Sequence, residues 1–148
     1  MDQLKLAALD QEDLDVVSAQ VQDAVLKVAD IHYDSRKKQL VLAMNRFAWD
    51  KAALARGRRR PELERRRAAL VVARADRPRA TRIRQDARDA VLSLLAIRFE
   101  ETDAPAGRIT LQFSGGAALT CDVECIEVQL TDLGAAWATE HLPRHDDD

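Results

Sequence analysis

The chain has 148 residues, of which 47% are hydrophobic and 32% are charged, and its formal net charge is −2. These values fit one ordinary domain with a core of its own, and they exclude a chain that is disordered throughout. No apolar run approaches the roughly 20 residues that cross a bilayer, and the first residues lack the pattern of a signal peptide. We therefore expect a cytoplasmic protein that makes no contact with a membrane.

The first predicted elements are a short strand over residues 4–9 and a helix over residues 11–24. Leu4 and Leu6 share one face of the strand. The Asp10 carboxylate can accept the free N–H groups of the first helical turn, and apolar residues follow at helical spacing from Leu14.

The next segment has the pattern of a hairpin, with strands over residues 25–33 and 39–49 around a polar turn over residues 34–38. Phe47 and Trp49 share one face of the second strand. They form either an aromatic platform on which bases could stack or a part of the core, and the core is the commoner place for such residues.

The middle of the chain is rich in arginine. Residues 56–84 hold twelve arginines against three acidic residues, a charge of +9, so the rest of the chain carries −11. Gly57 and Pro61 predict an exposed loop over residues 56–66, and strands are predicted over residues 68–73 and 79–84 with a turn at 76–78. The candidate contacts to nucleic acid or to a partner are Arg56, Arg58, Arg59, Arg60, Arg65, Arg66 and Arg67. The alternative is a solvated loop that pairs with acidic parts of its own chain or of another subunit.

The last third has the clearest pattern. Strands are predicted over residues 90–97, 109–113 and 119–123, and a tight turn at residues 114–116 joins the last two. Apolar residues spaced four, three and four apart from Ile126 to Trp137 predict a closing helix. In a strand Cys121 and Cys125 would lie about 13 Å apart, which is too far for a disulfide bond, so we expect two reduced thiols.

The predicted order of elements indicates a single α+β domain over residues 1–140, with a charged tail at residues 141–148. About six antiparallel strands in a short chain favour a strongly bent sheet or a partial barrel, with an N-terminal helix and a C-terminal helix. A pleckstrin-homology-like barrel fits this strand count by analogy.

Short motifs occur in order along nearly the whole chain: Leu4-Lys5-Leu6, Ala8-Leu9-Asp10, Glu12-Asp13-Leu14, Gln22-Asp23-Ala24, Asn45-Arg46-Phe47 with Trp49, Leu92-Ser93-Leu94-Leu95-Ala96-Ile97, Val123-Glu124-Cys125-Ile126-Glu127, and Asp132-Leu133-Gly134 with Trp137. Together they resemble a family of short, uncharacterised alphaproteobacterial proteins, a domain of unknown function. The resemblance implies a bacterial protein and brings no activity, so no catalytic residue is carried over.

The residues themselves indicate no catalytic constellation, no cofactor and no metal site. Glu124, Glu127 and Asp132 are expected to be surface charge or a docking site for the arginine loop of another copy. We expect a non-enzymatic module that binds another protein or forms a homodimer. Two alternatives stay open: an RNA-binding accessory protein that uses the arginines, and a small-ligand or enzymatic role in a barrel mouth, which needs a polar-lined pocket of at least about 300 Å³.

Overall fold

The computed structural model describes residues 4–49 and 63–133, with the backbone alone at residues 48, 49, 63 and 64. In chain order the elements are β1 (Lys5–Ala8), α1 (Gln11–Gln20), β2 (Val25–Lys27), the 3-10 helix η1 (Val28–Asp30), β3 (Ile31–Asp34), β4 (Gln39–Trp49), β5 (Leu63–Val72), β6 (Ala75–Thr81), β7 (Val91–Glu101), β8 (Gly107–Phe113), the 3-10 helix η2 (Ser114–Gly116), β9 (Ala118–Val123) and β10 (Val128–Asp132).

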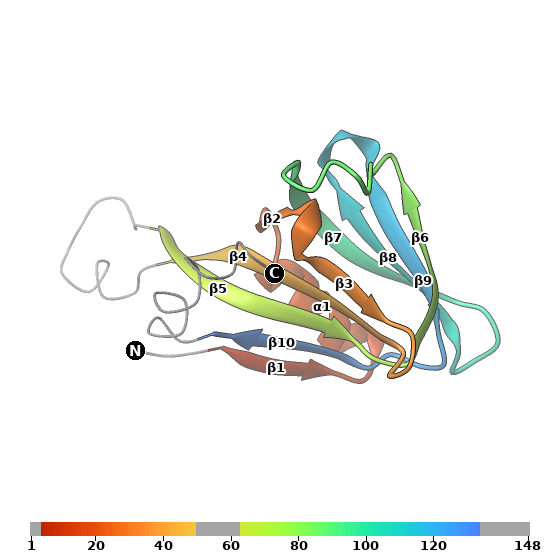
Figure 1. Ribbon diagram of the computed structural model, residues 1–148. Helices are drawn as coiled ribbons and strands as arrows, with labels where there is room; N and C mark the ends of the chain where they lie inside the picture. The colour runs from red at the N-terminus through yellow and green to blue at the C-terminus, as the bar shows by residue number, and fades with distance from the viewer. Residues whose placement is uncertain (1–3, 50–62, 134–148) are drawn as a thin grey trace.

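The strands form one antiparallel sheet in the order β1-β10-β5-β4-β2-β7-β8-β9-β6, with β3 also paired to β4. The short strand β2 pairs with both β4 and β7, and there the sheet bends into two layers (Figure 1). The first layer holds β1, β10, β5, β4 and β3, and the second layer holds β7, β8, β9 and β6. The expected bent antiparallel sheet is therefore confirmed. Over the described residues this sheet stays open, so these residues do not form the closed barrel of a pleckstrin-homology-like domain.

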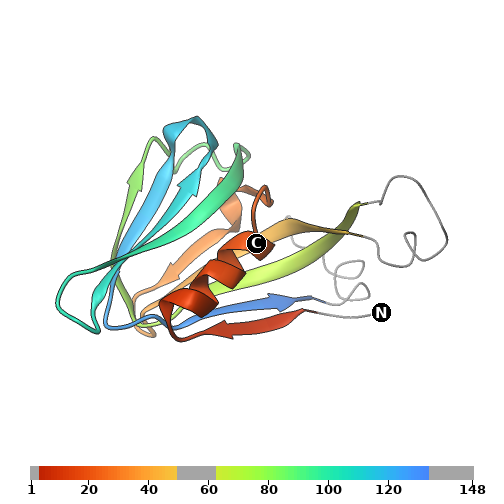
Figure 2. The ribbon, with the colours of Figure 1, turned by 180° about the vertical axis from the view of Figure 1, so that it is seen from behind.

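The helix α1 covers one side of the two layers, where it lies against β1 and β7 (Figure 2). Asp10 Oδ1 accepts a hydrogen bond of 2.8 Å from Asp13 N, so this residue is the N-cap that the sequence predicts. Ser18 Oγ accepts the Ile97 N–H at 2.9 Å and thereby satisfies a backbone donor of β7. Among the described residues, no helix combines the length and the apolar character that a membrane crossing requires.

The core fills the space between the two layers. Residues on alternate strand positions face it, which is why Ile109, Leu111 and Phe113 of β8 are buried while their neighbours are less so. Each leucine or isoleucine that is buried completely stabilises the fold by about 1.5–3 kcal/mol. The largest fully buried side chains are Leu14, Leu40, Leu42, Met44, Leu70, Leu94, Ile109, Leu111 and Leu130.

The closing helix predicted from Ile126 to Trp137 is wrong in its described part. Val128–Asp132 form β10, which inserts between β1 and β5. The side chains of Val128, Leu130 and Asp132 alternate into the interior, so this segment has the period of a strand. Its neighbours β1 and β5 offer this segment backbone hydrogen-bond partners on both sides, and this favours a strand over the helix that the same apolar residues also fit.

Other differences are smaller. The N-terminal helix ends at Gln20 instead of Ala24, and the strand predicted over residues 25–33 is broken by η1. The predicted turn at residues 76–78 is a bulge inside β6, where the register shifts between Asp76 and Arg79. Because β5 begins at Leu63, the last four residues of the predicted loop 56–66 are strand, and its other residues lie outside the described ranges, as does the tail 141–148.

Candidate functional site

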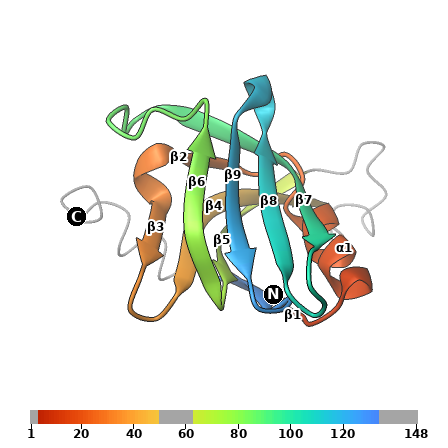
Figure 3. The same cartoon turned by 90° about the vertical axis from the view of Figure 1, so that its right-hand side faces the viewer.

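The strands β6, β9, β8 and β7 of the second layer lie side by side in Figure 3. The outer face of this layer carries polar side chains on all four strands. It arises from strand alternation, because each apolar residue that points into the core is followed by one that points to solvent. We call this surface the polar face, and its residues are Asp76, Arg77 and Arg79 of β6, Thr120 and Asp122 of β9, Arg108, Thr110 and Gln112 of β8, and Arg98 and Glu100 of β7.

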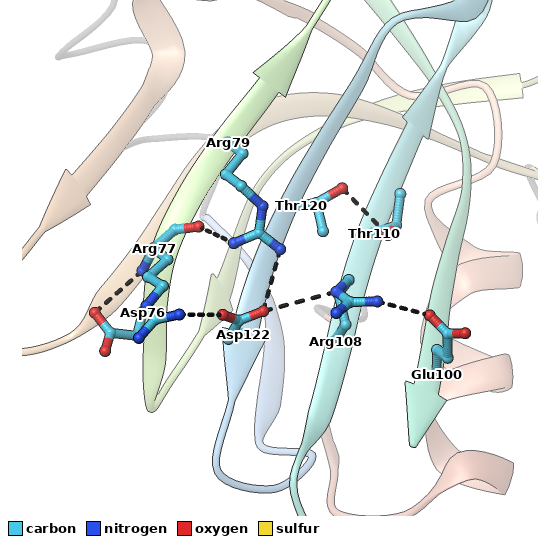
Figure 4. Close-up of polar contacts among 8 residues, drawn as sticks. All are labelled: Asp76, Arg77, Arg79, Glu100, Arg108, Thr110, Thr120 and Asp122. Carbon is cyan, nitrogen blue, oxygen red and sulfur yellow. Dashed lines mark hydrogen bonds and ion pairs between the residues drawn. The ribbon is translucent and has the colours of Figure 1, made fainter. Parts of the chain in front are cut away.

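Asp122 is the centre of the charges on the polar face (Figure 4). Arg79 Nη2 lies 3.1 Å from Asp122 Oδ1, Arg108 Nε lies 3.7 Å from the same oxygen, and Arg77 Nη1 lies 3.9 Å from Oδ2. The hydrogen bond from Arg79, helped by the charges of all three guanidinium groups, holds the pKa of Asp122 below its usual value. One negative charge therefore faces three positive charges.

Further contacts cross the polar face between neighbouring strands. Arg108 Nη1 donates to Glu100 Oε1 at 2.9 Å, and the hydroxyl groups of Thr110 and Thr120 lie 3.3 Å apart (Figure 4). The strand β7 also exposes two large apolar side chains: Val91 is 60% exposed and Leu95 is 43% exposed. The prediction of a strand covered on both faces at residues 90–97 is therefore wrong at these two positions.

A groove opens at one end of the polar face, where the connections β3–β4, β5–β6 and β7–β8 meet the end of β9. We call it the basic groove. Its volume is about 440 Å³, and its charged lining consists of Lys38, Arg74, Arg77 and Arg108 against Asp76, Asp122 and Glu124. Four basic side chains against three acidic ones give a net charge of +1. The volume exceeds the minimum that a small-ligand site needs, although the groove is not the mouth of a barrel.

Each of the other basic groups at the groove has an acidic neighbour. Arg74 Nε donates to Glu127 Oε1 at 2.9 Å, and its Nη1 lies 3.4 Å from Glu124 Oε1. The hydrogen bond to Glu127 raises the pKa of Arg74. Lys38 Nζ lies 3.5 Å from Asp76 Oδ2. Arginines of the basic segment thus pair with acidic residues of their own chain, which is one of the alternatives that the sequence leaves open.

The structure brings together two of the predicted sites in the first layer. Arg65 of β5 lies directly opposite Phe47 of β4, and both point away from the core. Arg65 is exposed, whereas Phe47 is half-buried. Arg67, two residues along, donates to Asn45 Oδ1 at 3.3 Å and lies 3.4 Å from Asp30 Oδ1, with its side chain 9% exposed.

The remaining predicted residues do not join this pair. Arg66 pairs in register with Arg46 on the inward side of the layer and has a bonding partner of its own. The backbone of Trp49 pairs with Leu63, but its side chain is not described. Arg56, Arg58, Arg59 and Arg60 lie outside the described residues.

The most deeply buried ionic contact was not predicted. Arg46 Nε and Nη2 each lie 2.7 Å from one oxygen of Asp132, and Leu4 N donates to Asp132 Oδ2 at 2.9 Å. Burial raises the pKa of Asp132, but the hydrogen bonds from Arg46 and Leu4 lower it further, so the carboxylate titrates below its usual range. Asp132 is thus part of the interior, contrary to the predicted acidic surface, while Glu124 and Glu127 do lie at the surface, beside Arg74.

The two cysteines are both free, as expected. Cys121 lies in the core, where burial, aided by the nearby Asp122, raises the pKa of its thiol to about 11. Cys125 is half-buried. Within residues 4–49 and 63–133, no three His, Cys, Asp or Glu side chains are grouped as a metal site would need.

Comparison with known proteins gives a family but no activity. The model of the family described as "Protein of unknown function (DUF2948)" matches residues 4–145. The chain belongs to this family. The resemblance to a domain of unknown function that the short motifs suggest is thereby confirmed. Neither the curated proteins nor the solved structures contain a match to the chain.

Part of the polar face could have been predicted from the sequence, because two of its contacts follow from one predicted hairpin. Positions equally far from the turn at residues 114–116 are partners, which places Arg108 opposite Asp122 and Thr110 opposite Thr120. Arg77 and Arg79 belong to the basic segment that the sequence shows. Their approach to Asp122 depends on the pairing of β6 with β9, for which the sequence has no local signal.

Proposed function

We propose that the protein is a non-enzymatic interaction module that binds another protein, or a second copy of itself, through the polar face. The observation that carries this proposal is the exposure of Val91 and Leu95 on β7, the strand that also contributes Arg98 and Glu100 to the polar face. Apolar anchors surrounded by polar and charged groups are the arrangement found in protein interfaces. A cytoplasmic location, which the two free cysteines support, is part of the same proposal.

The alternation of charge favours a protein partner over a polyanion. Glu100, Asp122 and Asp76 lie among the arginines of the polar face, so a continuous phosphate backbone would meet repulsion at several points. A protein surface can instead match both signs, which gives specificity and orientation. A second copy could do so as well, because the three carboxylates of one copy could face arginines of the other.

The proposal can be tested with a photoreactive residue placed at Thr120 in the middle of the polar face. Cross-linking in the bacterial cell, combined with analytical ultracentrifugation of the pure protein, separates a foreign partner from a second copy. The matched control carries the same residue at Gln129, an exposed position on the outer face of the first layer. We expect one defined cross-linked product from Thr120, and we expect Leu95→Asp to remove it.

Two results would contradict the proposal. One is a defined product from the Gln129 position with none from Thr120. The other is a product from Thr120 that Leu95→Asp leaves unchanged, since the apolar anchor would then take no part in the contact.

A second candidate function, RNA binding, is supported by the pair formed by Phe47 and Arg65. An aromatic ring next to an exposed guanidinium on a strand surface can stack a base and contact its phosphate. A salt-titrated binding assay with single-stranded RNA tests it. We expect binding that weakens with salt and that falls when Arg65→Gln or the triple change of Arg58, Arg59 and Arg60 to Gln is introduced. Arg88→Gln, on the loop before β7, is the control of equal charge, and a flat response in all variants would exclude RNA.

A further inference from the structure

We infer that the basic groove is a binding site for a phosphoryl group. This inference goes beyond the protein contact proposed above and does not need it, because a small phosphate ester could bind in the groove even if no protein covered the polar face. Three features of the groove support the site: its charge, the donors that remain available in it, and the backbone conformation of its basic residues.

The charge around Asp122 is unbalanced. One carboxylate has three guanidinium groups within 3.9 Å, and one of them, Arg79, makes a hydrogen bond with it at 3.1 Å. The other two, Arg77 and Arg108, lie at 3.9 and 3.7 Å, beyond hydrogen-bond length. Glu100 Oε1 accepts a hydrogen bond from Arg108 Nη1 at 2.9 Å, so the three guanidinium groups face two carboxylates in all. The local excess of one positive charge favours an anionic ligand.

Donors that could hold such a group are available at the mouth of the groove. A guanidinium has five N–H donors, and the Arg77 side chain is 78% exposed with one long contact to Asp122. Lys38, whose side chain is half exposed, also lines the groove, and one of its three ammonium donors approaches Asp76, which leaves two. Guanidinium forks bind two oxygens of a phosphate at once, so these side chains suit a tetrahedral anion.

The backbone gives an independent reason to assign a role to these side chains. Lys38, Arg74 and Arg77 have φ values of 54°, 54° and 52°, in the left-handed region that favours glycine or asparagine. The described residues include five such non-glycine positions, and three of them line this groove as basic residues. All three positions lie at a turn, at a bend or at the bulge of β6, and these changes of backbone direction bring three basic side chains to one groove.

The acidic residues of the groove define the ligand further. Asp76, Asp122 and Glu124 would repel the successive phosphates of a nucleic acid, whereas a single phosphoryl group can sit among the basic residues. The site therefore fits one phosphoryl group, carried either by a small molecule or by a phosphorylated serine or threonine of a protein.

The test is a titration of the full chain, followed through the arginine Nε–H signals by NMR at constant ionic strength. The probes are inorganic phosphate, a phosphoserine peptide and its unphosphorylated twin. We expect saturable shifts at Arg77 and Arg108, and an affinity for the phosphopeptide that rises between pH 5 and pH 7, because the second pKa of the phosphoryl group is about 6. A phosphopeptide that binds more tightly than phosphate assigns the site to a modified protein, and equal affinities assign it to a small phosphate.

Two substitutions should act in opposite directions. Arg77→Gln removes an exposed donor and should weaken binding about fivefold, while Asp122→Asn removes the competing carboxylate and should strengthen it about fivefold. Arg88→Gln carries the same change of charge away from the groove and should bind as the unaltered chain does. Leu95→Asp should also leave phosphate binding unchanged, so that failure of the protein contact and failure of this site are distinguishable.

The inference is overturned by shifts that grow linearly without saturation, by equal binding of the unphosphorylated peptide, or by an Arg77→Gln variant that binds as well as the unaltered chain. It is also overturned if an oligonucleotide without a terminal phosphate binds more tightly than the phosphopeptide. Arg77 is exposed, so its variant folds and is informative even if Asp122→Asn disturbs the sheet.

Discussion

The buried ion pair of Arg46 and Asp132 allows a quantitative test of the fold. Both residues are almost completely buried, with exposed fractions of 5% and 4%. Arg46 comes from β4 and Asp132 from β10, so the pair crosses β5 and joins three strands of the first layer. We predict that Arg46→Met destabilises the protein strongly, because it removes both hydrogen bonds from Arg46 and leaves the buried carboxylate with the Leu4 N–H and the charge of Arg66.

The expected cost follows from the two hydrogen bonds of 2.7 Å that the substitution removes. Loss of one partner of a buried ion pair costs about 3–5 kcal/mol, since the other charge then stays buried without compensation. For a chain of this size, each kcal/mol lowers Tm by roughly 2–4 °C, so Tm should fall by about 10 °C. The double variant Arg46→Met with Asp132→Leu buries no charge and should lie within about 2 kcal/mol of the unaltered protein.

Urea unfolding monitored by circular dichroism measures these differences in the free energy of unfolding. The unaltered protein, the two single variants and the double variant together form a double-mutant cycle. The control is Arg84→Met, which breaks an ion pair whose side chains are 81% and 75% exposed and should cost less than about 0.5 kcal/mol. A cost of Arg46→Met below about 1 kcal/mol, or a double variant that is less stable than either single one, would refute the reasoning.

Stability in acid, thiol reactivity and glycine substitutions test other parts of the structure. Since the pKa of Asp132 is lower in the folded than in the unfolded state, its contribution is complete above about pH 4 and is lost as pH falls further, so the urea midpoint should fall less in acid for the double variant. At pH 8 the Cys121 thiol should react with a disulfide reagent at least about tenfold more slowly than Cys125, and urea should abolish the difference. Gly107→Ala should cost about 1–3 kcal/mol in urea unfolding, because the new methyl group meets the Phe99 ring. Gly115→Ala, at φ +74° in open space, should cost only about 1 kcal/mol, and the reverse order would contradict the packing at β8.

Local sequence patterns were sufficient to predict much of the second layer. Alternation predicts β8 and β9, and the glycines at 115 and 116, with φ of 74° and 78°, form the tight connection that the sequence indicates. The register of this hairpin, and with it the contact between Arg108 and Asp122, then follows from counting residues out from the turn.

The strand β10 could not be assigned in this way. Its apolar residues fit helical spacing toward Trp137, and the inward position of Asp132 hides the alternation that marks a half-buried strand. Asp132 is tolerated there because Arg46 is its partner, and the two residues are 86 positions apart in the chain. The same long-range contact therefore explains both the wrong helix prediction and the missed ion pair.

The basic segment, residues 56–84, shows a different limit of prediction from the sequence. The sequence presents it as one charged feature, but the fold takes its described arginines to different places. For example, Arg67 reaches Asp30 in the first layer, Arg74 reaches Glu127 in the connection between β9 and β10, and Arg79 reaches Asp122 on the polar face. Composition could predict that these charges are paired within the chain, whereas the identity of each partner depends on which strands are neighbours.

The insertion of β10 between β1 and β5 has a consequence for how the chain folds during synthesis. Leu4 and Asp132, which hydrogen-bond to each other, are separated by 128 positions. β1 therefore leaves the ribosome well before its partner β10, and until β10 is made β5 presents an unpaired apolar edge at Leu70 and Val72. Folding of this sheet should be slow and should be completed only after β10 has been made, and shortened chains that stop before Val128 should aggregate instead of folding.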